Sequence, residues 1–171
     1  MTSTHTGGAR HPLLVLGIGN ILLSDDGIGV RVVQALDGAT GLPPETEVVD
    51  GGTQGLELLP LVATARALVI VDAVDVGAPP GSLHTYADDL LRATTGTHVT
   101  VHQVGLADMI GAARLTGVLP AHAVLIGIQV ATTSLGLTLS PSVARTVPAA
   151  MAAVQAWCTD FHHKSLVNRH S

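Results

Sequence analysis

The stretch Ala67-Leu68-Val69-Ile70-Val71-Asp72 is the strongest strand-like segment of this 171-residue chain. Its almost unbroken β-branched run is typical of a parallel strand that is covered on both faces. Residues 12–19 form a second apolar run, which ends in glycines and also predicts a buried strand. The core is therefore expected to be a sheet that is largely parallel.

Strand-like and helix-like segments alternate around these two runs. Further strands are expected at 47–49, 83–86 and 123–128, and helices at 26–36, 56–62, 103–115 and from 141 onward. Ser140 and Pro141 suit the N-cap and first turn of the last helix. The alternation predicts one three-layer α/β/α sandwich over residues 13–160, with about five strands, mostly parallel. Residues 1–12 and 161–171 are expected to be loose tails.

The composition excludes several classes of protein. A net charge of −5 and an aromatic content of 2% argue against nucleic-acid binding, which needs a basic face. No run of about 18 apolar residues is present, so no membrane insertion is expected. The chain lacks a signal peptide and has a single cysteine, Cys158, which favours a cytoplasmic location. Cys158 is expected to be a buried, inert thiol.

The glycine-rich loop at residues 17–29 suggests a dinucleotide site but does not fit one. The phosphate-binding fingerprint needs a third glycine where this chain has Leu22. Asp25 and Asp26 would also repel a pyrophosphate at the start of the following helix. No organic cofactor is therefore expected. The two acids could equally do no more than stabilise the helix macrodipole.

Three side chains are candidates for a metal site at the carboxyl edge of the sheet. Asp72 ends the strongest strand, where an unpaired buried carboxylate would cost several kcal/mol, so a functional role is favoured. Asp26 follows the first strand, and His102 lies at a junction between a loop and a helix. Ligands of parallel sheets bind beyond this edge. Two carboxylates and one imidazole suit a divalent transition metal.

Four segments resemble the hydrogenase maturation endopeptidases over roughly residues 13–158. They are Leu16-Gly17-Ile18-Gly19-Asn20-Ile21-Leu22-Leu23-Ser24-Asp25-Asp26-Gly27-Ile28-Gly29-Val30, Asp50-Gly51-Gly52-Thr53, Val71-Asp72-Ala73 and His102-Gln103-Val104-Gly105-Leu106. Any one of these alone would be a weak signal, but their order and spacing together are specific.

The resemblance implies a peptidase that removes the C-terminal extension of a nickel–iron hydrogenase large-subunit precursor after nickel insertion. It implies that Asp26, Asp72 and His102 are the metal-binding and catalytic residues. The nickel would be carried by the substrate. Cleavage would use either a metal-activated water or a carboxylate that acts as general base.

This chain departs from the family pattern at two places. Many members carry Glu where this chain has Asp26, and residues 129–132 lack a Pro-Glu pair that many members show.

Two other functions are open to the same chain. One alternative to the peptidase is a self-contained hydrolase with its own zinc at the same three residues. The other is a nickel-site chaperone without proteolysis. Asp50 is either functional or the first residue of an Asx turn.

Overall fold

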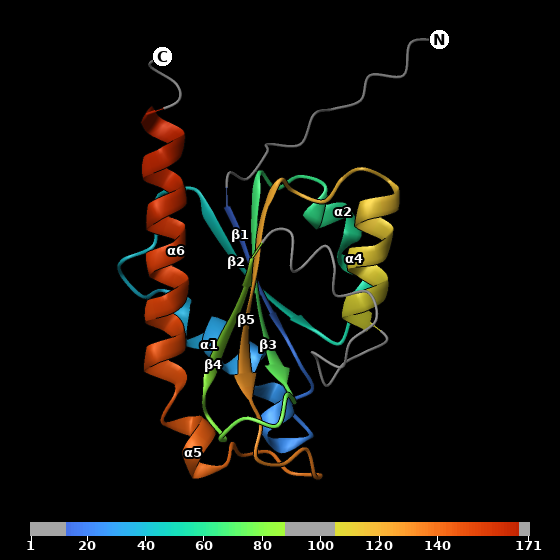
Figure 1. Ribbon diagram of the computed structural model, residues 1–171, viewed down its shortest axis with the longest axis vertical. Coiled ribbons are helices and arrows are strands. Elements are labelled where there is room, and N and C mark those ends of the chain that lie inside the picture. The colour runs from blue at the N-terminus through green and yellow to red at the C-terminus, as the bar shows by residue number, and fades with distance from the viewer. Residues whose placement is uncertain (1–12, 88–104, 168–171) are drawn as a thin grey trace.

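A five-stranded sheet forms the centre of the protein (Figure 1). The computed structural model describes residues 13–87 and 105–167. The strands are β1 (Leu13–Ile18), β2 (Thr46–Gly52), β3 (Ala67–Val74), β4 (Leu83–Ala87) and β5 (His122–Gln129). Their order is β2-β1-β3-β5-β4, and only the edge strand β4 runs antiparallel to its neighbour. The predicted mostly parallel sheet of about five strands is confirmed.

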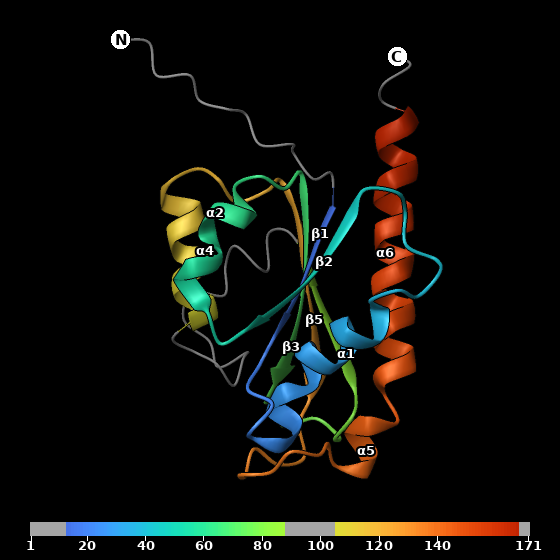
Figure 2. The ribbon, with the colours of Figure 1, turned by 180° about the vertical axis from the view of Figure 1, so that it is seen from behind.

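Helices cover both faces of the sheet. They are η1 (Ser24–Gly27), α1 (Ile28–Leu36), η2 (Gly55–Leu58), α2 (Leu59–Val62), α4 (Gly105–Leu115), α5 (Pro141–Ala144) and α6 (Val147–Val167). Figures 1 and 2 show α1 and α6 on one face and α2 and α4 on the other, so the α/β/α sandwich is confirmed. Within the two described stretches of chain, no helix has the length and apolar character needed to cross a membrane.

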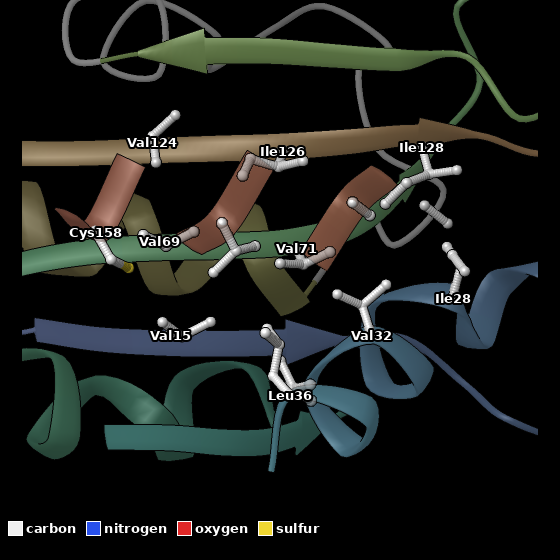
Figure 3. Close-up of a cluster of buried hydrophobic side chains, with 14 of the residues drawn as sticks. Val15, Ile28, Val32, Leu36, Val69, Val71, Val124, Ile126, Ile128 and Cys158 are labelled. Atoms are coloured by element: carbon white, nitrogen blue, oxygen red, sulfur yellow. The ribbon is translucent and has the colours of Figure 1, made fainter. Parts of the chain in front are cut away.

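Successive side chains of each strand point to opposite faces of the sheet, so the core consists of two apolar clusters. In β3, Val69 and Val71 pack on the face of α1 and α6, whereas Leu68 and Ile70 pack on the face of α2 and α4. Figure 3 shows the first cluster, which contains Cys158. Burial raises the pKa of the Cys158 thiol to about 12, so this cysteine is a protonated core residue, as predicted.

The chain continues from β1 and from β3 toward opposite edges of the sheet. After β1 it forms β2 at one edge, and after β3 it forms β4 at the other edge. The boundary between β1 and β3 is therefore the topological switch point, where sheets of this type bind their ligands. At this boundary α1 lies very close to both strands. A Cβ at Gly29 would come within 2.2 Å of the carbonyl oxygens of Ile18 and Val71.

Several element boundaries differ from those predicted. The helix expected from residue 26 begins with η1, and the α-helix proper starts at Ile28. The strand expected to end at Asp72 continues to Val74, because β5 pairs with it as far as Val74. The last helix is divided into α5 and α6.

The expected loose tail from residue 161 is helical through Val167. Local contacts explain this extension. Phe161 stacks on Trp157 with the ring centroids 5.9 Å apart, and Lys164 pairs with Asp160 at 2.6 Å. The first contact buries apolar surface, and the second is an i,i+4 pair of the kind that supports an exposed helix.

Replacing Gly29 with alanine should destabilise the protein. The new methyl group would collide with backbone at both strand ends, and such overpacking costs about 2 kcal/mol. Urea unfolding measures the effect. The matched control is Gly111→Ala in α4, where a Cβ meets nothing within 4 Å. The control should stabilise the protein by about 0.5 kcal/mol, and equal stability of the two variants would contradict the packing argument.

Candidate active site

Asp26 and Asp72 lie at the switch point between β1 and β3. The paired register of β1 and β3 ends at Gly17 and Val71, so Asp72 stands where β1 stops. The turn η1, which carries Asp26, contacts β3 at this place. In Figure 1 this turn is the blue helical segment beside the arrowhead of β3. Both carboxylates are fully buried.

Backbone amides orient both carboxylates. The amide of Asn20 donates to Oδ2 of Asp26 at 3.0 Å, and the amide of Ala73 donates to Oδ1 of Asp72 at 2.8 Å. Removing a carboxylate from water is costly unless donors or a cation compensate for it. Two such groups on adjacent elements offer oxygen ligands for a cation, or acceptors for a proton.

The third predicted ligand, His102, lies outside the described residues. The first described residue after it, Gly105, begins α4. Gly105 packs on Gly55, which follows the carboxyl end of β2. The chain therefore enters α4 beyond the same edge of the sheet. Within residues 13–87 and 105–167, no three His, Cys, Asp or Glu side chains could hold a metal ion together.

Asp25 has a structural role that its sequence context does not reveal. Its side chain is fully buried, and it accepts four hydrogen bonds from a segment more than 100 residues away. Oδ2 accepts from the amides of Ala131 and Thr132 at 2.9 and 3.1 Å. Ser140 donates its amide to Oδ1 at 2.6 Å and its hydroxyl to Oδ2 at 2.8 Å. Asp25 therefore fastens residues 131–140 to the turn that carries Asp26.

Ser140 is the N-cap residue of α5 and Pro141 lies in its first turn, as predicted. The Ser140 side chain makes no capping bond to that helix, and its hydroxyl donates to Asp25 instead. Two more contacts hold the same loop. The hydroxyl of Ser24 donates to the carbonyl of Ser134 at 2.9 Å, and the guanidinium of Arg31 donates to the carbonyl of Leu137 at 3.1 Å. The loop is thus bonded along its length to η1 and α1.

Gln129 and Asp50 serve local structure. Gln129 is buried, and its amide oxygen accepts from the backbone of Val76 at 2.9 Å and Ala78 at 3.3 Å. Asp50 is exposed, and its Oδ1 accepts from the amide of Gly52 at 3.0 Å. That bond is the Asx turn that the Asp-Gly-Gly sequence indicates. Asp75 is exposed, and its Oδ1 accepts from the side-chain amide of Gln129 at 3.1 Å.

A hollow lies at the end of the sheet opposite to Asp26 and Asp72. It has a volume of about 590 Å³ and is lined by the first residue of β5, His122, and by the C-terminal half of α6, including Trp157 and Phe161. Neither Asp26 nor Asp72 borders it. The buried carboxylates, and not this hollow, therefore mark the candidate active site.

Comparison with known proteins identifies close relatives. A family model described as hydrogenase maturation protease matches residues 30–157. The hydrogenase expression/formation protein HupD of Rhodobacter capsulatus is 43% identical over 151 residues, which cover 85% of this chain and 72% of HupD. The hydrogenase 2 maturation protease of Escherichia coli K12 is 39% identical over 145 residues, which cover 84% and 88%.

The fold also matches a solved structure. The hydrogenase maturating endopeptidase HybD from E. coli superposes with a TM-score of 0.80 at 37% sequence identity. The match covers 87% of this chain and 93% of HybD.

Asp25→Asn should loosen the loop of residues 131–140. An amide has one acceptor oxygen, so its NH₂ group would face at least one of the four donors. Losing a hydrogen bond to a charged group and leaving a donor unsatisfied should cost about 3 kcal/mol. Urea unfolding measures the loss, and hydrogen exchange at the amides of Ala131 and Thr132 should accelerate. Asp37→Asn, at an exposed carboxylate, is the control. Unchanged exchange in Asp25→Asn would contradict this role.

Proposed function

Because this chain belongs to the hydrogenase maturation protease family and is an endopeptidase, we propose that it cleaves the large-subunit precursor of a nickel–iron hydrogenase. The cut removes the precursor's C-terminal extension after nickel has been inserted. The nickel belongs to the substrate, which holds it through cysteine thiolates. Asp26, Asp72 and His102 contact that ion and so distinguish a loaded precursor from an empty one.

The observation that carries this proposal is the pair of buried carboxylates at the switch point. Asp26 and Asp72 are fully buried, and each is oriented by a backbone amide. Hard oxygen ligands with one imidazole suit a transient contact with nickel, because thiolates hold that metal more firmly. An ion that stays with the substrate can leave with the product, and the enzyme is then free for another precursor.

The proposal is tested by mixing the purified protein with nickel-loaded and with nickel-free precursor and following the precursor mass. The loaded precursor should lose its C-terminal extension, and the nickel-free one should keep its full mass. The nickel content of each preparation is measured beforehand. Equal cleavage of both forms would refute nickel recognition, and cleavage of neither would refute the proposed activity.

Asp72→Asn should abolish this cleavage with little effect on the fold. The amide keeps an oxygen that can accept from Ala73 but loses the charge that binds a cation or takes a proton. We expect the initial rate to fall by at least about 10²-fold, the usual contribution of such a group. Asp75→Asn, three residues along the chain and exposed, should retain the wild-type rate. Full activity of Asp72→Asn in a folded protein would show that this carboxylate is structural.

His102→Gln should lower the same initial cleavage rate, because it removes the third proposed ligand. The control is His98→Gln, four residues earlier in the chain, which should retain the wild-type rate.

A further inference from the structure

Exposed apolar side chains border the candidate active site. Ile21 and Leu22 precede η1, and Leu135 and Leu137 lie in the loop between β5 and α5. Leu135 is 86% exposed and Leu137 is 64% exposed. We call these four residues the apolar rim. Figure 2 shows the two segments together beyond the carboxyl ends of the strands, as the orange loop and the blue turn before α1.

Hydrogen bonds join the two halves of the rim. Leu23 and Gly136 form a parallel bridge. The amide of Gly136 donates to the carbonyl of Leu22 at 2.9 Å, and the amide of Ser24 donates to the carbonyl of Gly136 at 2.8 Å. Together with the bonds to Asp25 and Arg31 described above, they hold the backbone of the rim in place. The leucines are therefore exposed on a hydrogen-bonded backbone.

The rim is continuous with the carboxylate site. The amide of Asp26 donates to the carbonyl of Leu23 at 3.1 Å, and the side-chain oxygen of Asn20 accepts from the amide of Leu22 at 3.0 Å. Asn20 in turn donates its own amide to Asp26. The rim therefore lies directly beside the turn that carries Asp26.

The rim carries no charge of its own. Residues 131–139 read Ala-Thr-Thr-Ser-Leu-Gly-Leu-Thr-Leu, without an acid or a base. The nearby cation, Arg31, donates to the carbonyl of Leu137. Exposed apolar side chains that gather at one place, unlike single scattered ones, typically mark a surface that another protein covers, and the lack of charge here fits an uncharged, apolar partner surface.

We propose that the apolar rim is the docking surface for the hydrogenase large-subunit precursor, and that it binds an uncharged apolar segment of that protein beside its C-terminal extension. This inference rests on the proposed function. It separates two tasks at the same edge of the sheet. The carboxylates test whether nickel is present, whereas the rim selects which precursor is held there.

The test is the binding of nickel-free precursor, which should not be cleaved, to the full-length protein by biolayer interferometry. The double variant Leu135→Ser/Leu137→Ser should raise Kd by about tenfold for each leucine, the effect of losing one buried aliphatic side chain. With loaded precursor, KM should rise similarly while kcat stays within about twofold, because the rim contributes binding that is equal in ground and transition states. Both leucines are exposed, so the fold should be unaffected.

Leu115→Ser is the matched control. Leu115 is 91% exposed, but it ends α4 and precedes the start of β5, away from the carboxyl edge of the sheet. Its Kd and KM should equal those of the wild type.

The outcomes separate this inference from the proposed function. A wild type that binds precursor through the rim but leaves nickel-loaded precursor intact would refute the function and support the rim. A wild type that cleaves normally, with a double variant of unchanged Kd and KM, would refute the rim alone. Dissociation of a wild-type dimer in the double variant, again with unchanged Kd, would instead make the rim a contact between two copies and overturn the proposal.

Discussion

The hydrogen bonding of the buried Asp25 carboxylate is the interaction on which the candidate active site at the carboxyl edge of the sheet depends. It accepts four hydrogen bonds from Ala131, Thr132 and Ser140. These donors provide the solvation that burial takes away, and they therefore stabilise the carboxylate. Because Asp26 is the next residue, the same bonds that close the loop of residues 131–140 also determine where Asp26 lies. Asp25, which in the sequence resembles half of a catalytic pair, thus links η1 to the loop before α5.

Glycines make this tie possible, because they let α1 lie directly against the sheet. A Cβ at Gly19 would come within 2.0 Å of the carbonyl oxygen of Asp26, and one at Gly29 would strike both β1 and β3. The glycine-rich loop therefore brings backbone close to backbone, where a nucleotide-binding loop would bring backbone close to phosphate. The result is a buried carboxylate on each side of the switch point. Two such carboxylates can bind a cation or accept a proton.

Local sequence predicts most of the fold but not all of its boundaries. The apolar runs of β1, β3 and β5 are long and strongly patterned, and the alternation with helices leads directly to the three-layer sandwich. One boundary failed because a distant segment decided it: β3 continues past Asp72 because β5 pairs with it, and this partner is not visible in the local pattern of β3. The other failed although the contact is local, since α6 continues past residue 160 with Phe161 packed on Trp157 one helical turn away.

The sequence by itself determined the fold class, the family and the candidate residues Asp26 and Asp72, since these follow from short-range pattern and from four motifs in order. Only the tertiary structure decided which acid does what in the Asp25-Asp26 pair. Adjacent aspartates have the same intrinsic chemistry. What separates them is the direction of each side chain, Asp25 toward the loop before α5 and Asp26 toward the amide of Asn20. It likewise decided that the leucines of an uncharged loop lie beside the candidate active site, because hydrogen bonds between segments more than 100 residues apart bring them there. Long-range hydrogen bonding of this kind leaves no periodic trace in the chain, and so it cannot be inferred before the chain is folded.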